Sequence, residues 1–348
     1  PTRGFQVVAR YAVGGHVRPL LDVLRQFDPA QTLVAAASML FGARIAHEAW
    51  GMPWVTVHFQ PSLFRSVGDP PVLGSLAMPG WLPAGAKRAL FSLIDRGIID
   101  PALAPHVNPV RAELGLPPQR RFFGDGLHAP QKSLGLFPAW FAPPQPDWPP
   151  QVQLTGFVRY DRAALLGEGE ALDAALAAFL AAGEPPLVFT AGSANRHGRA
   201  FFETAVAAAR LLNRRALLVT QYPEQLPARL PAGVHAAAYV PFSRLLPRAA
   251  ALIYHGGIGT LAQAAAAAIP QLVMPMSHDQ PDNARRLRRL GIGDWLAPRQ
   301  WRPRAVAAKL EALLGNPAVA ARCAEVARQV DFDAGLARAC AAIMALAA

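Results

Sequence analysis

In one segment of the sequence, residues 251–268, a short apolar run is followed directly by a glycine-rich turn and then by an alanine-rich stretch typical of a helix. The run Ala251–Tyr254 is typical of a short buried strand, and we expect the helix to begin at Thr260. The turn consists of His255, Gly256, Gly257, Ile258, Gly259 and Thr260. Glycines at a strand-to-helix turn let the backbone approach a ligand closely, and the free N–H groups at the helix start favour a phosphate. The segment therefore indicates a diphosphate site, with a tight structural turn as the alternative.

A second apolar run, Pro270–Met276, ends in a polar stretch about twenty residues after the first. That stretch reads SHDQPDN over residues 277–283. Because ligands bind outside the carboxyl ends of the strands in open parallel sheets, both stretches would face one crevice. Asp279 and Gln280 offer hydrogen-bond acceptors and donors that suit sugar hydroxyls. Asn283 either caps the following helix or contacts the ligand.

Strand and helix patterns alternate along the second half of the chain, as in a parallel sheet with crossover helices. Strands are predicted at Leu187–Thr190, Ala216–Thr220, His235–Tyr239, Ala251–Tyr254 and Gln271–Pro275. Helices are predicted at Ala171–Ala182, Ala200–Asn213 and Thr260–Ala268, with two or more after Pro303. The first half gives fewer clear elements, namely strands at Thr32–Ala36 and Trp54–Val57 and a helix at Gly42–Trp50. The pattern predicts an α/β fold.

The length of 348 residues leaves room for two domains. A hydrophobic content of 52% allows each of them a substantial core. The stretch Pro138–Pro150 holds six prolines and is typical of a stiff connection, because proline prevents helix formation. We therefore place a boundary near residue 155, with a first lobe at 1–155, a second lobe at 156–335 and a C-terminal helix at 336–348.

The two motifs together resemble a known signature. HGGIGT at residues 255–260 and HDQPDNA at residues 278–284 are similar to the donor-binding signature of metal-independent glycosyltransferases that use nucleotide-diphosphate sugars. This family includes the plant and macrolide UDP-glycosyltransferases. The sequence also resembles the rhamnosyltransferase B subunit of rhamnolipid synthesis. This resemblance covers further segments, namely GARIAHEAWGMPW at 42–54, LFPAWFAPPQPDWP at 136–149 and PLVFTAGS at 186–193.

The resemblance implies a GT-B fold, which has two Rossmann-like lobes with parallel sheets. It also implies an incomplete N-terminal lobe, because the family's first lobe opens with a strand, a glycine loop and a helix. Here the sequence begins at Pro1 and enters what resembles the middle of that lobe.

The family pattern suggests a role for each residue that matches it. The implied diphosphate site comprises Ser193, His255, Gly256, Gly257, Gly259 and Thr260. Tyr239 and Val240 match the place where the nucleotide base stacks and is read, although Tyr239 could also be a core aromatic. Asp279 and Gln280 would hold the sugar. Gln263 stands where the plant pattern has a glutamate that contacts the ribose. His255 could instead be a histidine with a purely structural role.

The catalytic base is not assigned by this pattern. Residues 15–19, GHVRP, mimic a loop in which many relatives carry a basic histidine, which would be His16. Its spacing from the strand Thr32–Ala36 instead favours a helix position. In that case we expect the base in an N-terminal segment that this sequence does not include.

Other chemistry has little support in the sequence. Cys323 and Cys340 lack metal-site spacing, which fits a reduced cytosolic protein, and the GxSxG motif of hydrolases is absent. A net charge of +11, with a dense group at Arg285–Arg289, favours solvent exposure and mild attraction to anionic donors and membranes over nucleic acid. The sequence has no apolar run of 18 residues. We expect a cytoplasmic protein, possible peripheral contact with the inner membrane, and no metal or cofactor.

The sequence thus predicts an inverting glycosyltransferase. It would move a hexose or deoxyhexose from a TDP- or UDP-sugar to a hydroxyl of a lipid or natural-product acceptor. The alternatives are a non-catalytic sugar-nucleotide-binding fragment and a sugar-nucleotide epimerase. Aromatic and apolar candidates for an acceptor wall, which could equally be core, are Phe59, Leu63, Phe64, Trp81 and Phe91.

Overall fold

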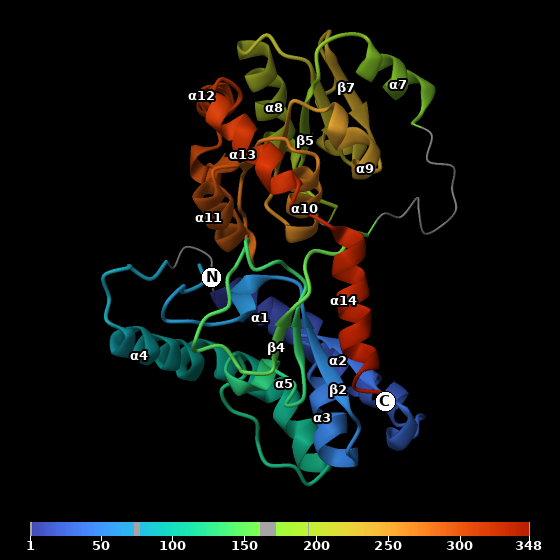
Figure 1. Cartoon of the computed structure of the whole chain (residues 1–348), viewed down its shortest axis with the longest axis vertical. Helices are drawn as coiled ribbons and strands as arrows, with labels where there is room; N and C mark the ends of the chain where they lie inside the picture. The colour runs from blue at the N-terminus through green and yellow to red at the C-terminus, as the bar shows by residue number, and fades with distance from the viewer. Residues whose placement is uncertain (1, 73–76, 161–171, 194, 348) are drawn as a thin grey trace. The chain divides into compact units, whose positions relative to one another are not determined.

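The computed structural model describes residues 2–72, 77–160, 172–193 and 195–347. The chain divides into two compact units (Figure 1). Unit 1 comprises Pro1–Gly156 together with Asp333–Ala348, and unit 2 comprises Phe157–Phe332. Each unit contains a parallel sheet with helices packed against it.

The sheet of unit 2 has six strands in the order β10-β9-β8-β5-β6-β7, and every neighbouring pair is parallel. The strands are β5 (Leu187–Thr190), β6 (Ala216–Val219), β7 (Val234–Ala237), β8 (Ala251–Tyr254), β9 (Gln271–Val273) and β10 (Gly293–Trp295). The chain runs outward from β5 to β6 and β7, then returns to β8 on the other side of β5. This reversal of strand order is the arrangement of doubly wound dinucleotide-binding folds.

The helices of unit 2 follow the predicted alternation. They are α7 (Ala174–Ala181), α8 (Arg199–Leu211), α9 (Phe242–Leu245), α10 (Ile258–Ala266), α11 (Gln280–Leu290), α12 (Pro303–Leu314) and α13 (Pro317–Ala327). The short helices η6 (Pro223–Gln225), η7 (Leu246–Arg248) and η8 (Pro298–Gln300) complete the unit. All five strands predicted here are confirmed, β5 and β8 to the residue. The start expected at Ala171 for the first helix lies outside the described residues.

Aromatic packing joins α8 to the segment between η8 and α12. The rings of Phe201 and Trp301 stack with centroids 5.1 Å apart, and Phe201 also contacts Phe189 of β5 edge to face. These side chains are buried within one hydrophobic cluster. Burying aromatic side chains of this size is a major favourable contribution to folding, so this cluster anchors the sheet whose strand ends carry the site.

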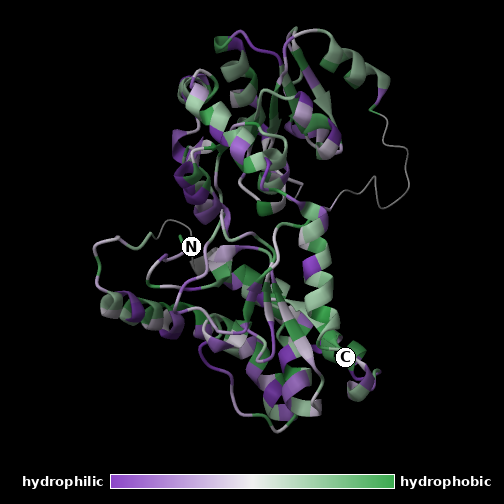
Figure 2. Ribbon diagram, viewed as in Figure 1, coloured by the Kyte–Doolittle hydropathy of each residue, from purple (hydrophilic) through white to green (hydrophobic). Residues whose placement is uncertain are grey.

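Helix α11 differs from its neighbours because it is largely hydrophilic (Figure 2). Its arginines were expected to form an open basic patch. Arg286 is instead buried, and its Nε atom lies 2.7 Å from Oδ2 of the buried Asp282. Arg285 lies 2.9 Å from the other oxygen of the same carboxylate. Part of the charge of this helix is therefore neutralised inside unit 2.

Unit 1 contains a four-stranded parallel sheet in the order β1-β2-β3-β4. The strands are β1 (Val34–Ala37), β2 (Trp54–His58), β3 (Ser133–Gly135) and β4 (Val152–Leu154). The α-helices among its described residues are α1 (Thr2–Val7), α2 (Gly15–Leu24), α3 (Phe41–Trp50), α4 (Ala84–Ile94), α5 (Asp100–Glu113) and α14 (Phe332–Met344). Other helical segments are η1 (Val8–Gly14), η2 (Pro29–Gln31), η3 (Pro61–Leu63), η4 (Asp95–Ile99) and η5 (Asp125–Leu127).

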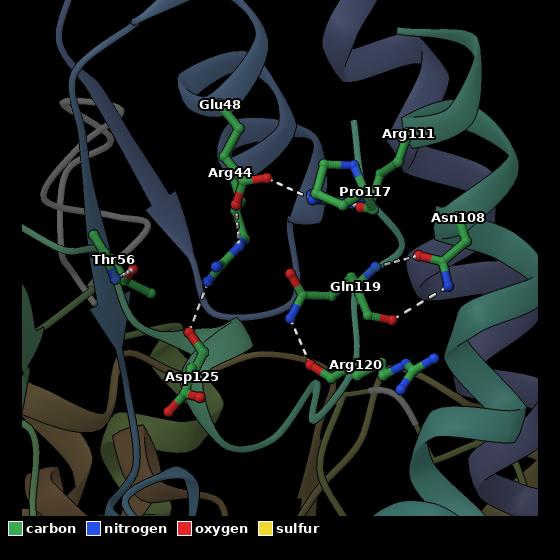
Figure 3. A network of polar contacts seen from close by, with 10 residues as sticks. Arg44, Glu48, Thr56, Asn108, Arg111, Pro117, Gln119, Arg120 and Asp125 are labelled. Atoms are coloured by element: carbon green, nitrogen blue, oxygen red, sulfur yellow. Dashed lines mark hydrogen bonds and ion pairs between the residues drawn. The ribbon is translucent and has the colours of Figure 1, made fainter. Parts of the chain in front are cut away.

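A network of polar contacts ties α3 to α5 and to the loop that follows it (Figure 3). Glu48 is shared by two arginines: Arg44 Nε lies 2.7 Å from one carboxylate oxygen and Arg111 Nη2 lies 2.6 Å from the other. Arg44 also donates to the carbonyl oxygen of Asp125, and Arg111 to that of Pro117. Because Arg111 is almost fully buried, these hydrogen bonds are needed to offset its loss of hydration.

The proline-rich stretch Pro138–Pro150 is not the connection between the units. It lies between β3 and β4, and both strands belong to the sheet of unit 1. Phe141 and Trp148 within it are buried, and Trp148 packs against Phe64 with ring centroids 4.9 Å apart. The stretch is thus a packed crossover, which its proline content did not distinguish from a linker.

The C-terminal segment belongs to unit 1, whereas the sequence placed residues 333–335 in the second lobe and set 336–348 apart. Arg338 of α14 donates to the carbonyl oxygen of Thr155 at 2.7 Å. Gly156 has φ +103, and a Cβ built on it would lie 3.5 Å from Cα of Gly335. This close backbone approach and hydrogen bond fix the last helix to the end of the first sheet.

Candidate functional site

The predicted site residues meet at the carboxyl ends of three neighbouring strands of unit 2. Ser193 lies in the loop after β5, His255 follows β8, and Asp279 and Gln280 follow β9. β8 lies between β5 and β9 in the sheet, and the strand order reverses between β5 and β8. Ligands bind to open α/β sheets at such a switch point. The geometry therefore supports a single site built from the two motifs.

The ring of His255 is held between two glycines. A Cβ built on Gly192 would lie 2.7 Å from Cε1 of the ring, and one built on Gly257 would lie 2.6 Å from Nε2. Gly192 also has φ +90, a backbone conformation that favours glycine. Burial lowers the pKa of His255, so the ring is neutral near pH 7, and its Nδ1 is buried without a partner among the described residues.

The helix after His255 begins earlier than expected. α10 starts at Ile258 rather than Thr260, so Gly259 and Thr260 belong to its first turn. Gly257 occupies the N-cap position and offers no side-chain cap, and a Cβ on Gly259 would have open space around it. First-turn amides of a helix have no intrahelical acceptor. These N–H groups and the helix dipole are therefore free to bind an anion.

The side-chain oxygen of Gln280 accepts hydrogen bonds within its own loop. The backbone N–H groups of Met276 and Ser277 donate to its Oε1, at 2.8 Å and 3.0 Å. Its Nε2 has no partner in the described part of the chain. Gln280 can therefore donate to a sugar hydroxyl, whereas the sequence suggested both donor and acceptor roles.

Asn283 connects the two motifs; it does not cap the helix, and the direct ligand contact also considered for it from the sequence stays a prediction. It lies in the first turn of α11, where Asp279 occupies the N-cap position, and its side chain is fully buried. Its Nδ2 atom donates to the carbonyl oxygen of Gly256 at 2.9 Å and to Oδ2 of Asp279 at 2.6 Å. Burial raises the pKa of Asp279, and the hydrogen bond from Asn283 opposes that change.

Comparison with known proteins agrees with this geometry. Residues 216–337 match the family model described as the C-terminal domain of erythromycin biosynthesis protein CIII-like proteins. O-mycaminosyltylonolide 6-deoxyallosyltransferase of Streptomyces fradiae is 36% identical over 249 residues, which are 68% of this chain and 55% of that protein. Glycosyltransferase GtfE of Amycolatopsis orientalis is 31% identical over 310 residues, which are 82% of this chain and 71% of the relative. The chain belongs to this family of natural-product glycosyltransferases.

Solved structures confirm the GT-B fold. The spinosyn rhamnosyltransferase SpnG complexed with thymidine diphosphate superposes with a TM-score of 0.67 at 20% identity, covering 97% of this chain and 80% of that one. The chain spans little more than half the length of the first relative. The expected likeness to the rhamnosyltransferase B subunit stays a prediction.

The Ser193 loop of this family member is held by residues at the end of the neighbouring strand β6. The carbonyl oxygen of Ser193 accepts hydrogen bonds from Gln221 Nε2 at 3.0 Å and from the Tyr222 hydroxyl at 3.1 Å. The Ser193 side chain is exposed. Gln221 and Tyr222 were missed in the sequence because their partner is a backbone group, which leaves no residue pattern.

The residues expected at the nucleotide base lie at the carboxyl end of β7. Tyr239 is 55% exposed, which excludes the alternative of a core aromatic, and Val240 beside it is buried. Gln263 lies on α10, and its Oε1 is buried with no partner among the described residues. Their roles at base and ribose stay predictions.

The candidates for an acceptor wall, all in unit 1, differ in their burial. Phe64 and Phe91 are buried core residues, whereas Phe59 and Trp81 are exposed. His16 is exposed on α2, as its spacing indicated. No hydrogen bond or ion pair between described residues orients His16 for a role as the base.

Sequence spacing gave no sign of a buried histidine pair in unit 1. The rings of His58 and His128 lie 4.8 Å apart, and His58 Nδ1 lies 2.7 Å from the Ser38 hydroxyl oxygen. Burial lowers the pKa of His58 well below its ordinary value and that of His128 to about 4. Both rings are therefore neutral near pH 7, and they pack with Phe64 as part of the core.

Two absences among the described residues bear on other functions. No group of three or more His, Cys, Asp or Glu side chains in them could hold a metal ion. No helix among them is long and apolar enough to cross a membrane.

Proposed function

We propose that this chain transfers a hexose or deoxyhexose from a TDP- or UDP-sugar to a hydroxyl group of a hydrophobic natural-product or lipid acceptor, with inversion at the sugar carbon. The observation that carries the proposal is the His255 ring, held by Gly192 and Gly257 beside the free first turn of α10. The family relationship supports the reaction class.

The reaction that this site would serve is a single displacement. A base takes the proton of the acceptor hydroxyl, the acceptor oxygen attacks C1, and the bond from C1 to the diphosphate oxygen breaks. Negative charge then develops on the leaving diphosphate. The N–H groups of Gly259 and Thr260 and the His255 ring would stabilise that charge, as preorganised donors do in acyl transfer.

The sugar would lie at the carboxyl end of β9. Asp279 would accept hydrogen bonds from sugar hydroxyls, and Gln280 would donate one from Nε2. Tyr239 and Val240 would bind the base at the end of β7. We favour a thymidine diphosphate donor, because the spinosyn rhamnosyltransferase structure contains thymidine diphosphate.

Calorimetric titration of the chain with TDP and with UDP tests the donor site. His255→Ala should weaken binding about tenfold, because it removes a hydrogen bond to a charged group. His16→Ala, which alters an exposed histidine in the other unit, is the matched control and should bind normally. Failure of the unaltered chain to bind either nucleotide would refute the proposal.

A turnover assay separates transfer from the alternatives. The transferase should release TDP or UDP only when an acceptor alcohol is present. A binding fragment would bind the donor without releasing nucleotide, and an epimerase would change the sugar of the donor without an acceptor.

A further inference from the structure

Two sequence motifs meet at one side chain, Asn283. Its single amide nitrogen carries two hydrogens, and each has an acceptor: the carbonyl oxygen of Gly256 and the Oδ2 atom of Asp279. The first acceptor belongs to the loop that would hold the diphosphate. The second belongs to the carboxylate that would hold the sugar.

The loop at Gly256 also lies close to β9 and to the loop that follows it. A Cβ built on Gly256 would lie 2.7 Å from Cγ1 of Val273 and 3.3 Å from Cβ of Gln280. Gly256 has φ +100, so glycine is required there by conformation as well as by space. Because no room for a side chain remains between Gly256 and its neighbours, and Asn283 bonds its carbonyl oxygen, a small shift in one loop displaces the other.

Burial makes the Asn283 hydrogen bonds difficult to replace. Asn283 is fully buried, so water cannot readily take over either hydrogen bond if the amide is removed. A buried carbonyl or carboxylate that loses its donor carries the full cost of its desolvation. The native arrangement of the two loops is therefore favoured only with an amide donor at this position.

We propose that Asn283 is a positioning residue that fixes the diphosphate loop and the sugar-binding carboxylate relative to one another, without touching the donor. This inference rests on the proposed function. A positioning role differs from a purely structural one. If Asn283 positions both loops, nucleotide affinity and sugar selectivity must change together when Asn283 is altered.

Two substitutions test the proposal. Asn283→Leu removes the donor at similar size, and Asn283→Asp replaces it with a carboxylate that faces Asp279. Both should weaken TDP binding at pH 7.5 by about tenfold. Both should also reduce discrimination between donors that differ in the configuration of one sugar hydroxyl. Leu287→Ala, a buried position on the same helix, is the control and should lower the unfolding midpoint while TDP affinity and sugar discrimination stay normal.

A pH profile of TDP affinity distinguishes positioning from general damage to the helix. In Asn283→Asp, two facing carboxyl groups can share one proton, which restores a donor between them as the pH falls. The loss of TDP affinity in Asn283→Asp, relative to the unaltered chain, should therefore become smaller towards pH 5. The loss in Asn283→Leu should not change in this way. Each comparison is made at equal pH, because His278, Asp282 and Tyr254 interact electrostatically with Asp279, and because the diphosphate loop itself contains His255.

The outcomes are distinct. Normal TDP affinity in Asn283→Leu, or a deficit in Asn283→Asp that does not change with pH, would overturn the inference. Loss of affinity with sugar discrimination unchanged would also overturn it. If the unaltered chain binds neither TDP nor UDP, the proposed function itself fails.

Discussion

At the scale of single residues, the site depends on how tightly the His255 ring is enclosed. Its orientation is set by the absence of side chains at Gly192 and Gly257 rather than by a hydrogen bond that the structure describes. An enclosed ring loses little further entropy when a ligand binds, so its N–H group is preorganised for the diphosphate.

Replacing Gly192 by alanine tests this enclosure. The new methyl group would meet the imidazole ring at under 3 Å, so the ring must turn away. We expect Gly192→Ala to weaken TDP binding about tenfold in calorimetry. Gly233→Ala is the matched control: Gly233 also has a positive φ, +80, but its Cβ would come no closer than 4.0 Å to a neighbour. Equal TDP affinities in the two variants would contradict the enclosure.

The lowered pKa of His255 predicts the pH dependence of nucleotide binding. A bound diphosphate favours the imidazolium form, so binding is accompanied by proton uptake when the pH approaches the pKa of the free protein. Because burial lowers that pKa, TDP affinity should rise as the pH falls below the ordinary histidine value. Titrations from pH 7.5 to 5 should show this rise in TDP affinity in the unaltered chain. In His255→Gln, the only pH dependence left should be the one that comes from protonation of TDP itself.

At the scale of elements, helix α10 contributes its free first turn. Its start at Ile258, with Gly257 as a cap that lacks a side chain, leaves the amides of the first turn directed towards a ligand. The helix need not be long for this purpose, because the dipole effect acts within its first turn.

Gly259→Asp tests this helix terminus. An acidic residue in a first turn stabilises a helix, and a Cβ at Gly259 has open space, so the unfolding midpoint should not fall. The same charge repels a diphosphate, and TDP affinity should drop by about tenfold or more. Gly259→Asn is the neutral control of similar shape. A Gly259→Asp variant that binds TDP as well as Gly259→Asn does would place the diphosphate elsewhere.

The elements show where prediction from sequence succeeded and where it could not. β5 and β8 have four consecutive buried apolar residues or threonine, so an apolar run marked them to the residue. β3, β4 and β10 have only three residues each, including Ser133, Gln153 and Asp294, and they form because neighbouring strands supply their hydrogen bonds. Such pairing is a tertiary effect that local pattern does not contain.

The same limit applies to the candidate site. His255, Asp279 and Gln280 became candidates because they stand in polar stretches that follow apolar runs and match a family signature. The role of Asn283 was missed because its acceptor, Gly256, lies 27 residues away along the chain. A hydrogen bond between loops becomes visible only when the sheet places the strand ends together.

At the scale of the whole molecule, stability should depend on pH through the buried histidines of unit 1. His58 and His128 have lowered pKa values in the folded state, whereas unfolded histidine titrates near 6.5. Their contribution is therefore fully present above pH 6.5 and is lost as the pH falls towards the folded pKa values. For His128, with a folded pKa of about 4, the loss amounts to about 3 kcal/mol at that pH.

Urea unfolding at pH 7 and pH 5 checks this expectation. The midpoint of the unaltered chain should fall on acidification, and His128→Phe should show a smaller fall because one buried titrating group is gone. His16→Ala, which removes an exposed histidine, should reproduce the fall of the unaltered chain. A midpoint in His128→Phe that falls as steeply as in the unaltered chain would contradict the assignment.

The return of α14 to unit 1 has a consequence for how the chain is made. Unit 2 is one uninterrupted piece of chain, whereas unit 1 needs residues 333–348, which are synthesised only after all of unit 2. Domains generally fold as units, those closer to the N-terminus first, during synthesis. Here that order is inverted: unit 2 can finish folding on the nascent chain before unit 1, because residues 1–156 cannot pack against α14 until that helix has been synthesised.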